Sequence, residues 1–170
     1  MIFVTVGTHE QQFNRLVKAV DKLREDKVIK EEVIIQTGYS TYEPKFCTWS
    51  SLYPYQEMVQ YVDEARIVIT HGGPSSFIMP LQIGKVPIVV PRQKRFGEHV
   101  NDHQVEFCRA IAERQNNIIV VEEIQKLWEN IENYDSIVLG LDREQSENNK
   151  RFITEFELAV EGLAKKGKNG

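Results

Sequence analysis

The segment from Thr70 to Ser76, with the sequence THGGPSS, contains the residue types of a phosphate-binding turn. It directly follows the apolar run Ile67–Thr70, which the pattern predicts as a buried strand, and Pro74 is typical of the first residue of a helix. The free N–H groups and positive dipole end of that helix would bind a phosphate or pyrophosphate. Glycines would let the backbone approach the ligand, and Ser75 and Ser76 would add hydroxyl donors. The alternative is a strand-to-helix turn whose glycines serve geometry alone.

Two further loops carry polar groups directly after predicted strands. The run Gly7-Thr8-His9 follows the first strand, and is a weak signal alone because it lacks the later glycines of a dinucleotide fingerprint. The segment Pro91–Gln104 follows a later strand with three cations, two histidines, two carboxylates and three amides. Ligands of parallel α/β sheets bind outside the carboxyl ends of the strands, so these two loops and the turn at His71–Ser76 should converge on one crevice.

The elements that must position these loops alternate along the chain. Short apolar runs predict strands, and longer segments with apolar residues at helical spacing predict helices. The predicted strands are Ile2–Val6, Val33–Thr37, an irregular strand near Phe46–Trp49, Ile67–Thr70, Val86–Val90 and Ile118–Val121. The predicted helices are, approximately, Glu10–Arg24, Tyr55–Glu64, Pro74–Ile83, Asn101–Gln115, Glu123–Glu132 and 143–165, with a turn at Tyr134–Asp142 and a disordered tail at 166–170. This alternation predicts an α/β fold with a parallel sheet covered by helices on both faces.

Composition narrows the class of protein. A chain of 170 residues with 41% apolar and 27% charged residues is typical of one globular domain, expected here over residues 1–165. The formal charge of −4 gives no broad attraction for nucleic acid, so no nucleic-acid partner is expected. Cys47 and Cys108 lack a paired-cysteine motif, and the sequence begins without a secretory signal or a membrane-spanning run. These features favour reduced thiols in a cytoplasmic protein.

Three motifs resemble those of a known enzyme family. They are VTVGTH at Val4–His9, ITHGGPSS at Ile69–Ser76, and GKVPIVVPR with GEHVNDHQ within Gly84–Gln104. Together they resemble the carboxyl-terminal domain of the MurG-like glycosyltransferases of family 28, over roughly Met1–Gln115. Within that family the chain looks most like the small β-1,4-galactosyltransferase-like subunits of bacterial capsule and exopolysaccharide synthesis, which are similar to the eukaryotic dolichol-linked GlcNAc transferase subunit. The resemblance implies a Rossmann-like domain, the carboxyl-terminal half of a GT-B glycosyltransferase.

The same resemblance implies which residues bind a nucleotide-sugar donor. They are Gly7, Thr8, His71, Gly72, Gly73, Ser75, Ser76, Arg92, His103 and Gln104. Gly72, Gly73, Ser75 and Ser76 would hold the phosphates, Gly7 and Thr8 would lie near the diphosphate or the interdomain cleft, and His103 and Gln104 would touch the donor sugar. Arg92 would offset phosphate charge or bond near the base, and the alternative for His71 is a packed turn residue whose ring bonds the backbone. One departure from the family pattern is Met79, which stands where a carboxylate usually binds the ribose.

No cofactor and no metal are expected. The segment Glu98–His103 admits a metal-site interpretation, because His99 and His103 are four residues apart and would share a helix face. A helix that begins near Asn101 would leave His99 outside it, and the sequence offers neither an evident third ligand nor an Asp-x-Asp motif. We therefore expect a metal-independent mechanism, in which a helix dipole and backbone donors stabilise the departing nucleoside diphosphate.

The resemblance implies inverting transfer of a hexose from a UDP-sugar to a lipid-linked saccharide, with galactose favoured over glucose and GlcNAc. Such transfer needs a general base, and His9 is the local candidate; alternatively His9 caps the first helix. The acceptor-binding half would be a separate membrane-anchored subunit, which would recruit this chain from the cytoplasm to the inner face of the membrane and without which the chain would be nearly inactive. The competing interpretations are a non-catalytic nucleotide-sugar-binding or enhancer subunit, and an unrelated nucleotide- or phosphate-binding module.

The terminal helix offers a candidate contact for that partner. Its apolar stripe consists of Phe152, Ile153, Phe156, Val160 and Leu163, with charged residues on the other face. One interpretation is that the stripe packs on the protein's own sheet. The other is that it docks on the membrane subunit.

Overall fold

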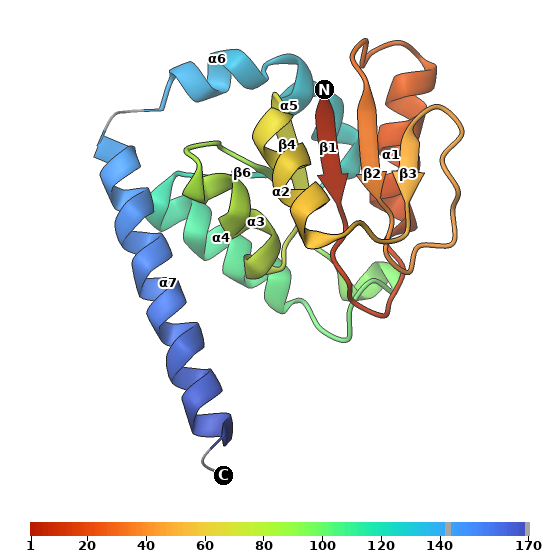
Figure 1. Ribbon diagram of the computed structural model, residues 1–170. Coiled ribbons are helices and arrows are strands. Elements are labelled where there is room, and N and C mark those ends of the chain that lie inside the picture. Colours follow the sequence, from red (N-terminus) through yellow and green to blue (C-terminus); the bar gives the residue numbers. More distant parts are fainter. Residues whose placement is uncertain (142–143, 169–170) are drawn as a thin grey trace.

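Six strands form one parallel sheet in the computed structural model (Figure 1). The structure describes residues 1–141 and 144–168, with side chains described within 1–141 and 150–162. The strands are β1 (Ile2–Thr5), β2 (Val33–Gln36), β3 (Thr48–Ser50), β4 (Ile67–His71), β5 (Ile88–Val90) and β6 (Ile119–Val120). Their order is β3-β2-β1-β4-β5-β6, and every neighbouring pair is parallel. The predicted α/β class is confirmed.

The direction of winding reverses between β1 and β4. From β1 the chain proceeds to β2 and β3 on one side, then returns to β4 and continues to β5 and β6 on the other. Thr5 of β1 pairs in register with both Gln36 of β2 and Thr70 of β4, so the loops that follow these strands start at one level. In open α/β sheets such a reversal opens a crevice at the carboxyl edge. The expected convergence of the loops is therefore built into the strand order.

Helices cover both faces of the sheet. They are α1 (Asn14–Glu25), α2 (Tyr55–Glu64), α3 (Pro74–Gln82), α4 (His103–Gln115), α5 (Leu127–Glu132), α6 (Tyr134–Leu139) and α7 (Glu144–Lys168), with short 3₁₀ turns η1 (Lys94–Phe96) and η2 (Ile124–Lys126). Side chains of α1, α5 and α6 pack on Ile2 and Val4 of β1, whereas α2 packs on the opposite face around Phe3. Helices α3, α4 and α7 share a cluster with Val89 of β5. Burial on both faces explains why the inner strands are continuously apolar.

Helix α1 begins at Asn14, four residues later than predicted. The carbonyls of Gln11 and Gln12, which an earlier helical turn would use, accept hydrogen bonds from Arg92 Nη1 at 2.9 and 3.2 Å. The Phe13 N–H donates to Ser40 Oγ at 3.0 Å. Contacts with segments distant in the sequence therefore hold residues 7–13 as a loop, which apolar periodicity could not reveal.

A helix also replaces the turn expected at Tyr134–Asp142. Tyr134 begins α6, is buried against the sheet, and donates its hydroxyl hydrogen to the Val86 carbonyl at 2.7 Å. This tertiary contact stabilises a short helix whose sequence has only a weak helical pattern. Residues 142–143 lie outside the described part of the chain.

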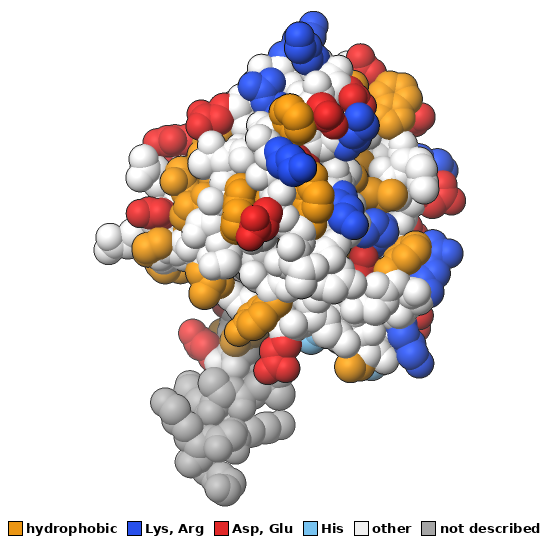
Figure 2. Space-filling model, turned by 90° about the vertical axis from the view of Figure 1, so that its right-hand side faces the viewer, with side chains coloured by type: hydrophobic (Ala, Val, Ile, Leu, Met, Phe, Trp, Pro, Cys, Tyr) orange, Lys and Arg blue, Asp and Glu red, His pale blue; other side chains and the backbone are white. Residues whose placement is uncertain are grey.

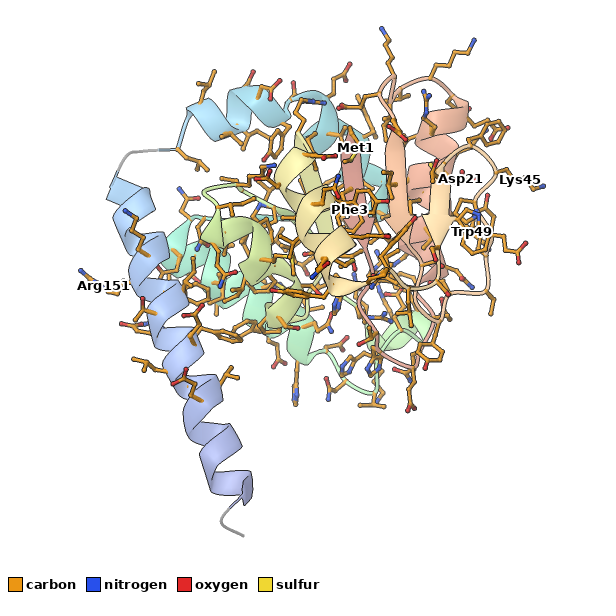
Figure 3. All side chains as sticks on the ribbon, viewed as in Figure 1. Met1, Phe3, Asp21, Lys45, Trp49 and Arg151 are labelled. Atoms are coloured by element: carbon orange, nitrogen blue, oxygen red, sulfur yellow. The ribbon has the colours of Figure 1, made fainter. Side chains whose placement is uncertain are left out.

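The β3 edge is tied to α1 by a buried carboxylate. Asp21 accepts hydrogen bonds from the Tyr42 hydroxyl at 2.6 Å and from the Phe46 N–H at 2.8 Å, which holds the segment that leads into β3 (Figure 3). Burial opposes ionisation of Asp21, but its hydrogen bonds outweigh that effect and lower its pKa. Trp49 lies at this edge, whereas Phe3 lies in the middle of the sheet. Seen from the edge, apolar side chains are interspersed with charged ones (Figure 2).

Helix α7 packs against α3 and α4 and then continues past the loops at the carboxyl edge of the sheet (Figure 1). Phe152 is buried, and Ile153 and Phe156 pack beside it on the α3–α4 cluster. Val160 is 48% exposed, and the side chain of Leu163 lies outside the described residues. The helix ends at Lys168, so residues 166–168 are helical where a disordered tail was expected. None of the helices in the described part of the chain is long and apolar enough to cross a membrane.

Candidate functional site

A crevice of about 400 Å³ lies at the reversal between β1 and β4. Its walls combine the first loop, the turn after β4 and the start of α4. They consist of Thr5, Gly7, Thr8, His9, Gln36, Met58, His71, Ser75, Ser76 and Gln104. The structure thus brings together seven of the eleven residues proposed from the sequence, namely Gly7, Thr8, His9, His71, Ser75, Ser76 and Gln104.

The first turn of α3 supplies the unused donors of the crevice. Pro74 occupies the first helical position, and no side chain caps this end of the helix. Helix geometry leaves the N–H of Ser75, in the second position, without an intrahelical acceptor. The positive end of the helix dipole adds to this donor, and the hydroxyls of Ser75 and Ser76 lie on the same wall. Such an arrangement binds an anion.

Gly72 and Gly73 contribute differently from the expectation. The Gly72 N–H donates to Gln104 Oε1 at 3.1 Å, and the Gly73 N–H donates to His71 Nδ1 at 3.2 Å. Both amides are therefore used inside the protein and do not face the crevice as free donors. Their lack of side chains is what matters, because a Cβ on Gly73 would lie 2.2 Å from the His71 ring. The two glycines shape the turn, while α3 presents the donors.

His71 is enclosed by its neighbours. Its Nε2 lies 2.9 Å from Ser76 Oγ, and Gln104 Nε2 lies 3.4 Å from its Nδ1. Gly7, at φ +74°, approaches so closely that a Cβ there would lie 2.3 Å from Nε2. Burial, together with the nearby charge of Arg92, lowers the pKa of His71 to about 3. The imidazole is therefore neutral at physiological pH.

Arg92 holds two of the loops together. Its guanidinium is fully buried and donates to the carbonyls of Val6 at 2.7 Å and Glu98 at 3.1 Å, in addition to those of Gln11 and Gln12. Burial lowers its pKa to about 10, so it stays charged at neutral pH. This placement corrects the expectation that Arg92 faces the phosphates or the base. Its two terminal nitrogens, Nη1 and Nη2, bind main-chain oxygens, so Arg92 positions the loops instead.

A buried ion pair joins the same loops to α1. Arg15 binds Glu98 through two contacts of 2.9 and 3.0 Å, and Glu98 also accepts the Gln93 N–H at 3.0 Å. Paired and hydrogen-bonded, the Glu98 carboxylate is satisfied where it is buried. It is thereby occupied as a structural group rather than as a metal ligand.

His9 lies on the rim of the crevice. Its Nε2 lies 3.0 Å from Gln11 Oε1, and its ring stacks on His99 with centroids 4.7 Å apart. Because α1 begins at Asn14, His9 does not cap that helix. Burial and the neighbouring His9 lower the pKa of His99. A nitrogen on a loop at the mouth of the crevice is where a base for an incoming hydroxyl would stand.

Two other sequence expectations concern residues outside the crevice. His103 is the first residue of α4 and is exposed, with its N–H bonded to Asn101 Oδ1 at 3.0 Å. Met79 packs among apolar side chains between α2 and α3, and Met58 of α2 lines the crevice instead. The side of the crevice beside α2 therefore carries a thioether, and among the residues that the structure describes no carboxylate lines the crevice.

Sequence reasoning missed Thr5 and Gln36. Thr5 Oγ1 accepts hydrogen bonds from the Gly7 N–H at 3.2 Å and from Gln36 Nε2 at 3.3 Å, which fixes the start of the first loop. Both are polar residues in otherwise apolar strands, and this interruption was the available signal. Each lies at the carboxyl end of its strand, where a polar side chain can face the crevice.

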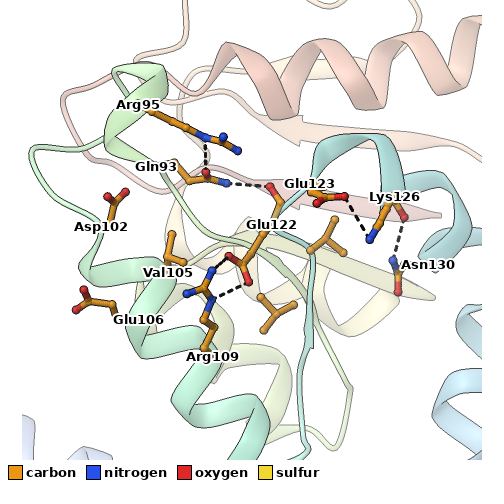
Figure 4. A pocket seen from close by; sticks show the side chains of 12 residues that line it. Gln93, Arg95, Asp102, Val105, Glu106, Arg109, Glu122, Glu123, Lys126 and Asn130 are labelled. Atoms are coloured by element: carbon orange, nitrogen blue, oxygen red, sulfur yellow. Dashed lines mark hydrogen bonds and ion pairs between the residues drawn. The ribbon is translucent and has the colours of Figure 1, made fainter.

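A larger hollow of about 720 Å³ lies on the other side of α4 (Figure 4). Arg109 contacts Glu122 through both carboxylate oxygens, and Lys126 pairs with Glu123 at 3.2 Å. Two of its cations are thus paired with carboxylates, and the carboxylates of the described lining outnumber its cations. Over the residues that the structure describes, no three His, Cys, Asp or Glu side chains are grouped so that they could hold a metal ion.

Known structures with related architecture are glycosyltransferases. The chain is similar to the glycosyltransferase SnogD from Streptomyces nogalater, with a TM-score of 0.58 and 17% identity over 96% of this chain and 42% of that one. It is also similar to the glycotransferase of kitacinnamycin, with a TM-score of 0.52 and 14% identity over 92% and 39% of the two chains. At these identities the likeness shows the fold alone, and it agrees with the Rossmann-like half of a GT-B enzyme.

Sequence comparisons give the family. The human UDP-N-acetylglucosamine transferase subunit ALG13 is 31% identical over 119 residues, which are 65% of this chain and 10% of ALG13. The chain therefore spans about a tenth of that relative's length. The family model for the glycosyltransferase family 28 C-terminal domain matches residues 1–161, well beyond the motifs that first suggested it. Because this match covers nearly the whole chain, the protein belongs to the glycosyltransferase family 28 C-terminal domain family.

Proposed function

We propose that this chain is the donor-binding, catalytic subunit of a UDP-sugar-dependent glycosyltransferase that acts on a lipid-linked saccharide. The observation that carries the proposal is the uncapped first turn of α3, which opens into the crevice at the β1–β4 reversal. A diphosphate is the part of a nucleotide sugar that such a helix terminus binds best. Family membership supports the same reaction class.

Transfer would proceed without a metal ion. The Ser75 N–H, the two serine hydroxyls and the dipole of α3 would stabilise the negative charge that develops on the departing UDP. His9 would accept the proton of the acceptor hydroxyl as it attacks the anomeric carbon, with inversion. Its position on the rim of the crevice supports this role.

The donor sugar is best decided by direct comparison. The sequence resemblance favours UDP-galactose, and the name of the human relative adds UDP-N-acetylglucosamine. Calorimetric titration with these two donors, UDP-glucose and GDP-mannose should show tightest binding for one UDP-sugar. Equal affinity for GDP-mannose would contradict a site specific for UDP.

The acceptor would be bound by a membrane-anchored partner subunit, which would bring this chain to the cytoplasmic face of the membrane. Leu158 and Val160 on the projecting part of α7 are 63% and 48% exposed, whereas Phe152 is buried in the protein's own core. The outer part of α7 therefore remains available for the partner.

Replacement of both Leu158 and Val160 by Gln should abolish co-purification with membranes from the native host and leave the melting temperature unchanged. Thr154→Gln is the matched control, since Thr154 is an exposed polar residue of the same helix. Retained membrane association of the double variant would contradict docking through α7.

The catalytic role is tested in host membranes that contain the partner. His9→Ala should lower turnover at saturating donor about 100-fold, as expected for loss of a general base, with little change in donor affinity. Unchanged turnover would instead support the second interpretation, a non-catalytic donor-binding subunit whose partner supplies the chemistry.

A further inference from the structure

The hydrogen bonds around His71 determine which of its nitrogens carries the hydrogen. The Gly73 N–H can only donate, so Nδ1, at 3.2 Å from it, must present a lone pair. In a neutral imidazole the hydrogen then resides on Nε2, which lies 2.9 Å from Ser76 Oγ. His71 therefore donates to Ser76, and the serine oxygen is the acceptor.

The Ser76 hydroxyl is oriented by this hydrogen bond from His71. Because its oxygen accepts from His71, its own hydrogen must point elsewhere, and Ser76 lies on the wall of the crevice. A hydroxyl whose oxygen accepts a hydrogen bond from His71 is oriented to donate its own hydrogen to an anion in the crevice. Ser75 lines the same wall, and no hydrogen bond joins its side chain to His71 or to Gln104.

The ring has little freedom to turn away. Gly7 and Gly73 pack against it so closely that a Cβ on either would lie 2.3 or 2.2 Å from ring atoms. Gln104 adds a third restraint, since its Oε1 accepts the N–H groups of Gly72 at 3.1 Å and Arg92 at 3.0 Å while its Nε2 lies 3.4 Å from Nδ1. His71 thus joins the loop after β1, the turn after β4 and the start of α4.

We propose that His71 is a positioning residue, which together with Gln104 directs the Ser76 hydroxyl hydrogen at the diphosphate of the donor. It neither touches the phosphates nor transfers a proton during the reaction. This inference rests on the proposed function, because it places the diphosphate in the crevice. His71 and Gln104, which the sequence resemblance placed in contact with the donor, would then act through Ser76.

The first test needs neither ligand nor variant. Nitrogen-15 NMR of the imidazoles in the full chain should show His71 with hydrogen on Nε2 and an unprotonated Nδ1, unchanged between about pH 5 and pH 8. A hydrogen on Nδ1, or titration of His71 within that range, would overturn the proposal. Because this measurement requires no donor, it distinguishes failure of the inference from failure of the proposed function, which shows as absence of UDP binding.

The second test is a double-mutant cycle read as UDP affinity. His71→Leu and Ser76→Ala should each weaken binding about tenfold, and the double variant should bind no more weakly than either single one. In the matched cycle, Ser75→Ala should add its full effect to that of His71→Leu. His71→Gln, whose amide can donate to Ser76 from the Nε2 position, should recover most of the affinity. Independent effects at positions 71 and 76, or no recovery with Gln, would contradict positioning through Ser76.

Discussion

The two hollows at the carboxyl edge of the sheet differ in what their polar groups already bind. In the larger one, Arg109 and Lys126 are paired with Glu122 and Glu123, and the carboxylates of the described lining outnumber its cations. In the smaller crevice, the first turn of α3 keeps an uncapped N–H on Ser75. The larger hollow is about 720 Å³ and the crevice about 400 Å³. An unused backbone donor and a described lining without carboxylates, rather than volume, therefore favour the crevice as the proposed anion site.

The two regions also differ in how they are supported. Around the crevice, Arg92, Glu98 and Gln104 are buried or partly buried side chains that bind main-chain groups of several loops. Around the larger hollow, the corresponding pairs join exposed or half-buried side chains, and such pairs contribute little to stability. A site that must hold donors at fixed positions needs the first kind of support. Substitutions in the two regions should therefore behave differently.

The largest expected effect follows loss of the buried arginine. Arg92→Met would leave the carbonyls of Val6 and Glu98 buried without donors, and should lower the free energy of unfolding by about 3 kcal/mol. Urea denaturation measures the change. Arg95→Met, on the wall of the larger hollow, is the control and should cost less than about 0.5 kcal/mol. Similar losses of unfolding free energy in the two variants would contradict the claim that the crevice is supported more strongly than the larger hollow.

The next effect concerns the packing of the turn. In Gly73→Ala the new methyl group would lie 2.2 Å from His71, so the ring must shift and release Ser76. UDP affinity should fall about 30-fold, equivalent to roughly 2 kcal/mol. Gly162→Ala introduces the same group into open space on α7 and should leave UDP affinity unchanged. Normal UDP binding by Gly73→Ala would show that His71 is not confined as described.

Acid should lower the free energy of unfolding through His71. The pKa of His71 is lowered to about 3 in the folded protein, so the unfolded chain binds more protons between that value and about 6.5. Its contribution to stability is complete above about pH 6.5 and falls by about 1.4 kcal/mol per pH unit below it. Most carboxylates remain ionised between about pH 6.5 and pH 4.5, so they contribute little to the slope in this window. His99, whose pKa is also lowered, adds to this loss, so chemical denaturation of the wild type should show at least this slope across the window. The slope should be smaller in His71→Gln, and equal slopes would assign the loss to other groups.

The smallest effect belongs to the larger hollow. Glu122→Gln removes the charge partner of the exposed Arg109 and should change the unfolding free energy by less than about 1 kcal/mol. UDP affinity should stay within about twofold, because the crevice lies on the other side of α4. A substantial loss of UDP binding in this variant would move the site to the larger hollow.

The sequence predicted the sheet and its edge better than the roles of individual side chains. Apolar runs of four or five residues identified the inner strands, because a sheet buried on both faces leaves that signature. The helix predicted at Glu10–Arg24 begins four residues too early, because Arg92 binds the carbonyls of Gln11 and Gln12 and holds them in a loop. Periodicity carries no information on such distant contacts.

Residue type likewise indicated membership of the site but not orientation. Position after a strand placed both Gly73 and Ser76 at the crevice; Ser76 lines it, whereas Gly73 does not. That the Gly73 amide turns to His71, and that Gln104 binds backbone rather than facing outward, depends on three loops meeting. Arg92 shows the same limit, because the position of a cation after a strand does not indicate whether it binds a phosphate or main-chain carbonyls.

The central claim is that the uncapped start of α3 binds the diphosphate of a UDP-sugar. Titration of the isotopically labelled chain with UDP, followed by calorimetry and amide NMR, tests it most directly. We expect heat of binding together with shifts of the Gly7, Ser75 and Ser76 amides, while the amides of Glu122 and Lys126 stay unperturbed. No heat and no shifts, or shifts confined to the segment from Glu122 to Lys126, would contradict it.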